Sequence, residues 1–194
     1  MADLPRAHSA ITGTPVSEID PNQAGLFLRD QSEWAKVLVH HNREDAATPV
    51  SVGFGSVTSP APGVHMVGWA PDQTLVLGRS SEDAADVVTI AFEKAPVTTV
   101  DLTHGYTMFS IRGESAIDTL AKLCAVDMSQ RTPAGSVART SVAKVAAGII
   151  KLHDDPAEFL ILCDRSYGRY LFEEMLVAAA EFGPAVQEPP TIWN

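Results

Sequence analysis

The chain has 194 residues, the size of one ordinary domain of ~100–200 residues, which argues against two independent cores. Apolar residues make up 45% and charged residues 20% of the sequence, and this excludes a fully disordered or collagen-like chain. The formal net charge is −10, so the surface should repel phosphate backbones, and we expect no nucleic-acid partner.

The first 22 residues mix Pro, Ser, Thr and Gly with isolated apolar residues. Such a segment buries little by itself, so we expect 1–22 to be an extended arm that orders only against another surface. The start carries an acid, Asp3, with no apolar core after it, and no apolar run approaches the ~20 residues of a bilayer span. Cys124 and Cys163 lie in apolar surroundings, which is typical of buried thiols in a reducing compartment. These features predict a cytoplasmic protein with no membrane partner.

Residues 26–95 contain signals for strands, a hairpin and one helix. Residues 34–39 alternate around Lys36 and predict a strand, whereas the prolines and glycine of 57–63 predict a loop. Two apolar runs, 65–70 and 74–78, flank a Pro-Asp pair and predict a hairpin. Ser80 is positioned to cap a helix whose apolar residues recur at helical spacing: Ala84, Val87, Val88, Ala91 and Phe92.

Residues 97–183 give clearer signals. Five segments have the composition and alternation of strands: 97–100, 107–112, 136–142, 146–152 and 159–163. A helix is predicted after Ser115, and a second one capped by Ser166 and ended by Gly183-Pro184. The order of these elements predicts an α+β fold with split β-α-β layers. We expect a single domain over 23–183, with sub-halves of about 26–95 and 97–183, followed by a tail over 184–194.

Motifs that carry catalysis are not found in the sequence. It contains no G-x-G-x-x-G, no Walker loop, no G-x-S-x-G elbow and no histidine spacing typical of a metal site. We therefore assign no catalytic residue, no metal ligand and no cofactor to this chain. Asp101 could orient His104 for proton transfer; alternatively, Asp101 and Thr103 cap a turn and leave His104 in solvent, which is the interpretation that we favour.

Five further residues are candidates for binding. Asp127 follows the helix that ends near Cys124. Its carboxylate could face a ligand; alternatively, Asp127 is an ordinary polar residue at the end of a helix. The start of the last helix is surrounded by Arg165, Tyr167 and Arg169. Three interpretations are open for these side chains: they are solvated, they hold an acidic group of a ligand, or they form a protein interface. Trp193 lies beyond that helix, where it docks on a partner or folds back on its own domain. These last four residues are the candidate interface.

Several segments together resemble one protein family. They are Val100-Asp101-Leu102-Thr103-His104-Gly105, Ile111-Arg112-Gly113, Leu120 to Asp127, Pro133 to Thr140, Arg165-Ser166-Tyr167 with Tyr170-Leu171, and Ala178 to Gly183. In order and spacing they resemble the gamma subunits of heterotetrameric sarcosine oxidases. The hairpin Ala70-Pro71-Asp72-Gln73-Thr74-Leu75-Val76-Leu77-Gly78 is similar to that family's G-P-D-E-W-L-type hairpin, with Ala70 and Thr74 in place of glycine and tryptophan. The resemblance covers about 28–183 and is strongest from Val97 onward.

The resemblance implies a fold similar to the folate-binding domain of glycine-cleavage T-protein. It implies membership of a complex that oxidatively demethylates sarcosine to glycine, passes the one-carbon unit to tetrahydrofolate and makes hydrogen peroxide. In that family, alpha, beta and delta subunits carry FAD, FMN, NAD, tetrahydrofolate and zinc, and gamma carries no cofactor. This chain would then serve assembly rather than catalysis. Asp127 falls where the T-protein pattern places its folate-contacting aspartate, but the later T-protein motif for the folate tail has no counterpart here.

A second class of function stays open from the sequence. The chain could be a free-standing folate protein, either a T-protein-like aminomethyltransferase or the related iron–sulfur maintenance protein. Its length argues against the first, and no Lys-Gly-Cys-Tyr-type motif supports the second. Whether the complex would act on sarcosine or on a related N-methylated amine such as dimethylglycine is also open.

Overall fold

The chain is described by a computed structural model over residues 25–41, 52–92, 96–129 and 132–187. Within these ranges the strands form two sheets. The six-stranded sheet has the order β11 (Ala185–Gln187), β1 (Leu26–Asp30), β7 (Tyr106–Gly113), β10 (Ala157–Asp164), β9 (Val145–Asp154) and β8 (Val137–Val142). The five-stranded sheet has the order β3 (Val57–Ala61), β4 (Val64–Ala70), β5 (Gln73–Gly78), β2 (Ala35–His40) and β6 (Thr98–Asp101).

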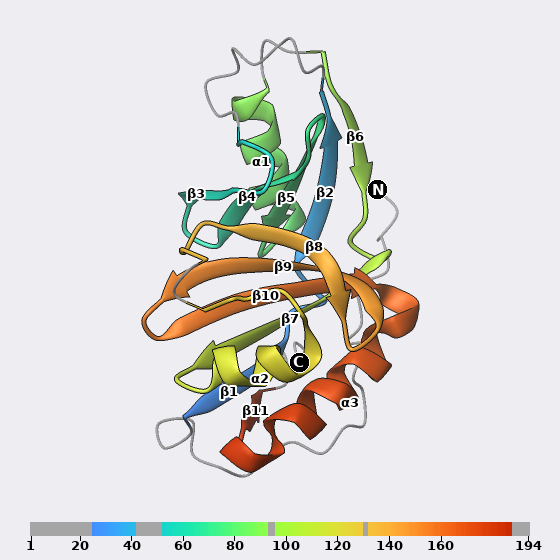
Figure 1. Cartoon of the computed structure of the whole chain (residues 1–194). Helices are drawn as coiled ribbons and strands as arrows, with labels where there is room; N and C mark the ends of the chain where they lie inside the picture. Colours follow the sequence, from blue (N-terminus) through green and yellow to red (C-terminus); the bar gives the residue numbers. More distant parts are fainter. Residues whose placement is uncertain (1–24, 42–51, 93–95, 130–131, 188–194) are drawn as a thin grey trace.

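The helices cover the outer faces of the two sheets, so the molecule has four layers (Figure 1). Helix α1 (Ser81–Ala91) packs on the five-stranded sheet, whereas α2 (Ala116–Leu123) and α3 (Gly168–Ala179) pack on the six-stranded sheet. Short 3-10 turns flank α3: η2 (Arg165–Tyr167) before it and η3 (Ala180–Phe182) after it. The inner faces of the sheets meet through buried apolar side chains: Trp34, Val67, Trp69, Leu75, Leu77, Met108, Ile150, Leu160 and Leu162. The expected α+β class is confirmed.

The two sheets do not divide at the boundary between the predicted sub-halves. Strand β1, from the first half, pairs antiparallel with β7 and parallel with β11 in the six-stranded sheet. Strand β6, from the second half, pairs antiparallel with β2 in the five-stranded sheet. Each sheet therefore takes one strand from the opposite half of the chain.

The segment before β3 joins the two sheets along one side. The Gly55 N–H donates to the Gly68 carbonyl of β4 at 3.0 Å, and the Val137 N–H of β8 donates to the Gly55 carbonyl at 2.8 Å. Two residues on, the Val57 N–H donates to the Gly135 carbonyl at 2.8 Å. A Cβ atom at Gly68 would collide with the Gly53 carbonyl. Close approach of two backbones therefore explains the glycine at position 68.

Most predicted elements are confirmed. The hairpin β4–β5 and the strands β2, β6, β7, β8, β9 and β10 lie where the sequence places them. Ser80 caps α1, since its side chain accepts a hydrogen bond from the Asp83 N–H at 3.1 Å. Gly183 ends η3 with a left-handed φ of 58°, which glycine adopts without strain.

Three predictions about secondary structure need correction. The loop predicted over 57–63 contains strand β3, which tolerates Pro60 because it is an edge strand with an irregular register beside β4. Ser166 does not cap α3, because the 3-10 turn η2 precedes the helix and Tyr167 stands at its cap. Strands β1 and β11 were not predicted, and β11 takes residues 185–187 of the expected tail. The predicted arm over 1–22 and Trp193 lie outside the described residues.

Candidate functional site

Asp127, the candidate folate residue, lies in a loop after α2. Its side chain is exposed, and its Oδ1 accepts a hydrogen bond from the Ser129 N–H at 2.9 Å. Its carbonyl accepts a hydrogen bond from the Thr132 hydroxyl at 2.6 Å. The loop is thus closed on itself, and an exposed carboxylate stands on it.

A buried lysine holds this loop from the six-stranded sheet. The Lys151 ammonium of β9 donates to the carbonyls of Ser129 at 3.0 Å and Thr132 at 2.8 Å, and it lies 3.4 Å from the Met128 carbonyl. It also pairs with Asp154 at 2.8 Å, while its side chain has no exposed area. Hydrogen bonds from Lys151 and from the Ala134 N–H lower the pKa of the Asp154 carboxyl. Sequence reasoning missed Lys151; the signal was one lysine inside the apolar run of β9.

A shallow cavity of ≈ 590 Å³ opens beside this region. Its lining includes three acidic residues, and the full set is Gly113, Glu114, Ile117, Pro133, Asp154, Asp155, Pro156 and Ala157. Among the described residues, Asp127, Arg165, Tyr167 and Arg169 do not line it. The carboxylate of Asp127, the candidate folate contact, therefore does not lie in this cavity.

The structure brings three of the candidate interface residues together on η2 and the start of α3. The Arg165 N–H donates to the Gly105 carbonyl at 2.9 Å, which ties η2 to the turn before β7. Tyr167 is 51% exposed, and Arg169 pairs with Glu173 at 3.0 Å on the surface of α3. This surface lies beside the turn between β8 and β9 (Figure 1). It presents aromatic and charged groups that suit a protein contact.

The turn at Asp101–Gly105 is a structural turn. Asp101 accepts a hydrogen bond from the Thr103 N–H at 2.8 Å, and the Thr103 hydroxyl accepts one from the Lys36 N–H at 3.1 Å. His104 is exposed. The favoured interpretation is confirmed for Asp101, which caps the turn, and for the exposed His104, whereas the Thr103 hydroxyl bonds to β2 instead of capping the turn.

Lys36 is the second buried lysine that the sequence did not single out as special. Its ammonium donates to the carbonyls of Ser32 at 2.9 Å and Trp34 at 2.8 Å, and its side chain is fully buried. Burial lowers the pKa of Lys36 to about 8, while Asp30 opposes this shift. The lysine fixes the connection by which the chain passes from β1 to β2 and so from one sheet to the other.

We expect the free energy of unfolding to rise as the pH increases from about 8 to 10.5. In this window the unfolded chain keeps a proton on Lys36 that the folded chain has lost, so raising the pH favours the folded state. The slope from one proton is at most about 1.4 kcal/mol per pH unit. Urea denaturation at several pH values checks this, with Lys36→Met and the exposed-lysine variant Lys144→Met in parallel. A slope that persists in Lys36→Met would contradict the assignment to this lysine.

Three general features bear on the class of site. Among the residues that the structure describes, no group of three His, Cys, Asp or Glu side chains is arranged to hold a metal ion. In the same ranges, the helices are too short or too polar to cross a membrane. Cys124 and Cys163 are buried and unbridged, and burial raises the pKa of the Cys163 thiol to about 12.

Comparison with known proteins gives the fold. Neither a protein-family model nor a curated protein matches the chain. It superposes on a chain of the heterotetrameric sarcosine oxidase from Corynebacterium sp. U-96, in complex with pyrrole 2-carboxylate, with a TM-score of 0.67 at 20% identity. That match covers 82% of this chain and 86% of the other. It also superposes on aminomethyltransferase T of the glycine cleavage system from Bartonella henselae, with a TM-score of 0.59 at 16% identity.

The second match covers 85% of this chain but 48% of the aminomethyltransferase, so the chain spans about half the length of that protein. At these identities the comparisons establish a shared fold. The T-protein-like α+β architecture that the sequence predicts is therefore confirmed.

Proposed function

We propose that this chain is a gamma-type accessory subunit of a heterotetrameric sarcosine oxidase. The proposal rests on how much of each similar structure the chain covers. It covers 86% of the length of the sarcosine oxidase chain but only 48% of the length of aminomethyltransferase T. The family segments found in the sequence, which are strongest from Val97 onward, support the same assignment. The complex would demethylate sarcosine or a related N-methylated amine, with tetrahydrofolate as one-carbon acceptor, in the cytoplasm.

In this proposal the chain contributes surface rather than chemistry. Alpha, beta and delta subunits would carry FAD, FMN, NAD, tetrahydrofolate and zinc. The contact surface would be formed by Arg165, Tyr167 and Arg169, with Trp193 as a further candidate. Tyrosine and arginine are enriched at interface centres, because each combines a large contact area with a polar end. Tyr170, which is 42% exposed and donates its hydroxyl to the Ala143 carbonyl at 3.2 Å, extends the aromatic part of this surface.

Purification of the tagged full chain from cells that express the whole complex tests the proposal. We expect mass spectrometry to identify subunits of a flavin-containing amine oxidase in the eluate, whereas the chain expressed alone should be colourless. Tyr167→Ser combined with Arg169→Ser should reduce partner recovery at least tenfold, which is the usual scale for interface hot spots. The matched control is Ile90→Ser on α1, since Ile90 is 71% exposed and lies on the opposite outer layer.

Two results would contradict the proposal. One is recovery of no flavin-containing partner by the unmodified chain. The other is binding of a reduced folate by the chain alone, with loss of that binding in Asp127→Asn, because this would favour a free-standing folate protein. Isothermal titration calorimetry of the isolated chain with 5-formyltetrahydrofolate measures the second result, and the purification above measures the first.

A further inference from the structure

Strand β6 forms one edge of the five-stranded sheet and is exposed along its whole length. It pairs antiparallel with β2 on one side, and the structure describes no strand on its other side (Figure 1). The Leu102 N–H, just after β6, donates to the Lys36 carbonyl of β2 at 2.7 Å. Backbone groups alternate in direction along an antiparallel strand, so Val100 also faces β2. The N–H and carbonyl groups of Thr99 and Asp101 therefore point away from the sheet.

These outward backbone groups form no hydrogen bond within the part of the chain that the structure describes. Thr99 and Asp101 are both exposed, so the four groups are open to a second strand. Their spacing is that of alternate residues, which is the spacing at which an antiparallel strand exchanges hydrogen bonds with its neighbour. The edge of β6 can therefore pair with the backbone of an extended segment.

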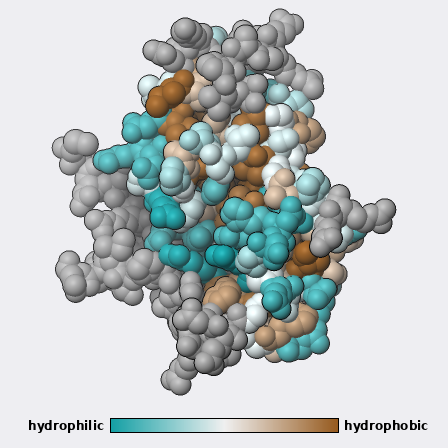
Figure 2. All heavy atoms as spheres, turned by 90° about the vertical axis from the view of Figure 1, so that its left-hand side faces the viewer, coloured by the Kyte–Doolittle hydropathy of each residue, from teal (hydrophilic) through white to brown (hydrophobic). Residues whose placement is uncertain are grey.

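The other sheet edges that the structure describes carry features that hinder strand addition. Strand β3 contains Pro60 and has an irregular register beside β4. Figure 2 faces the side of the molecule on which β3 lies and shows hydrophilic side chains gathered across its middle. Strand β8 is preceded by Ser136, which is bridged to Ser56, and β11 has only three residues. By contrast, β6 contains no proline, no lysine and no bulge.

The side chains of β6 define the chemistry of a segment that fits beside it. Val100 is 41% exposed and lies opposite Leu38 of β2, on the face that contacts the six-stranded sheet. An apolar side chain of an incoming strand would extend this contact. On the other face, Asp101 is the one charged side chain between Pro96 and Thr103, so a lysine or arginine of the incoming strand would complement it. A strand that alternates apolar and basic side chains suits both faces.

We propose that β6 accepts an extended strand of a partner subunit, with apolar side chains on one face and basic side chains on the other. This inference rests on the proposed function, because the partner is a subunit of that complex. The edge is continuous with the candidate interface, since β6 leads into the turn whose Gly105 carbonyl accepts the Arg165 N–H of η2 at 2.9 Å. The added strand would extend the five-stranded sheet and bring the partner alongside η2 and α3.

Hydrogen exchange followed by mass spectrometry tests the proposal on the purified complex and on the full chain alone. Over residues 97–104 we expect exchange in the complex to be at least about tenfold slower than in the chain alone, because two outward amides gain acceptors. Equal exchange in a complex that the unmodified chain does recover would overturn this inference and leave the proposed function standing. Recovery of no flavin-containing partner would overturn both.

Protection of residues 97–104 in the chain alone would also overturn the proposal. If that protection is independent of concentration, another segment of this chain occupies the edge. If it increases with concentration, a second copy of the chain occupies it.

Two variants make the test specific. Thr99→Pro removes an outward N–H that takes no part in the pairing with β2, so we expect about tenfold weaker partner recovery. Its control, Thr99→Ala, keeps the N–H and should recover the partner like the unmodified chain. Val100→Lys places a charge at the apolar contact and carries the test if Thr99→Pro does not fold, with the exposed Ile90→Lys on α1 as its matched control. Unchanged recovery in a folded Thr99→Pro, or in Val100→Lys where Thr99→Pro does not fold, would refute strand addition.

Discussion

Replacing Lys151 with methionine is expected to lower the free energy of unfolding by about 3 kcal/mol. The methionine side chain fills the same space but removes the donor shared by the carbonyls of Met128, Ser129 and Thr132. A buried polar group left without a partner costs about 1–3 kcal/mol. The carbonyls of Met128 and Thr132 lose the Lys151 donor, whereas the Ser129 carbonyl keeps the Thr132 N–H at 3.0 Å. The Asp154 carboxylate, half exposed, stays hydrated after the change, so it adds little to the loss.

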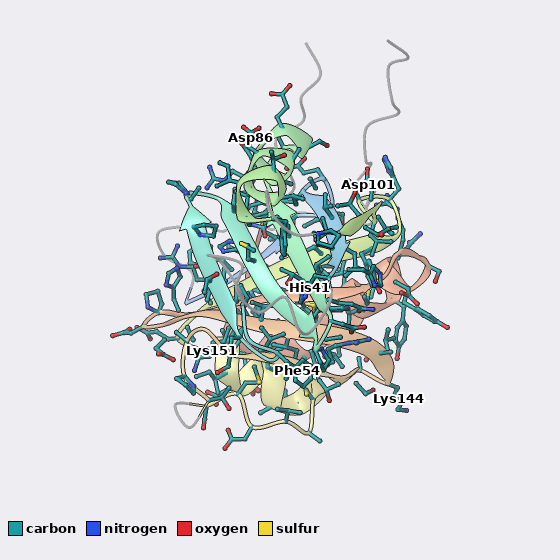
Figure 3. All side chains as sticks on the ribbon, turned by 90° about the horizontal axis from the view of Figure 1, so that it is seen from above. His41, Phe54, Asp86, Asp101, Lys144 and Lys151 are labelled. Carbon is teal, nitrogen blue, oxygen red and sulfur yellow. The ribbon has the colours of Figure 1, made fainter. Side chains whose placement is uncertain are left out.

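Urea denaturation followed by circular dichroism measures this effect. Lys144→Met is the matched control, since Lys144 is exposed at the turn between β8 and β9. Figure 3 shows the two lysines toward opposite ends of β9. A loss below about 1 kcal/mol for Lys151→Met would mean that water replaces the ammonium group easily and that the Asp127 loop does not depend on it.

Substituting Gly148 with alanine should destabilise the fold by about 1–3 kcal/mol or more, the usual range for overpacking a core. A Cβ atom at position 148 would collide with the six-membered ring of Trp69. The ring has little room to retreat, because the guanidinium carbon of Arg139 lies 4.9 Å from its centroid and the Tyr106 ring stands edge-on at 6.4 Å. The two sheets would have to separate locally.

Thermal and urea unfolding of Gly148→Ala check this expectation. Gly105→Ala is the matched control, because a Cβ atom there would make only ordinary contacts of 3.5 Å or more. Combining Gly148→Ala with Trp69→Leu removes the collision and should make the effect of the alanine smaller than in the single variant. Equal losses for Gly148→Ala and Gly105→Ala would show that glycine flexibility, rather than the indole, sets the effect.

The strands inside each sheet were largely predictable, because burial on one face leaves alternation or apolar runs in the sequence. Strand β10 is an apolar run with both faces covered, and β7 alternates around Phe109 and Ile111. Strand β1 was missed because only five residues alternate there, and its partners lie about 80 and 160 residues later in the sequence. Local patterns carry no information about such distant partners.

The site was less predictable than the fold. The capped turn at Asp101 follows from short-range hydrogen-bonding preferences, which the sequence displays directly. Lys36 and Lys151 look like ordinary polar breaks in strands, and only the tertiary structure shows that each donates to carbonyls inside the protein. The ring contacts of Trp34 join residues 34, 65 and 79, whose spacing in the sequence has no period.

The exchange of β1 and β6 between the sheets constrains how the chain acquires its structure during synthesis. The five-stranded sheet has all its strands once residue 101 has emerged, but β1 must then wait for β7 and finally for β11, which ends at residue 187. Within the part of the chain that the structure describes, the first strand therefore gains its last neighbour from the last strand. Pairing across such sequence distances is intrinsically slow, because the loop must close before any contact forms. Nascent chains should consequently expose the Leu26–Asp30 edge until β11 is made, which makes this strand a target for chaperones that protect unpaired strands.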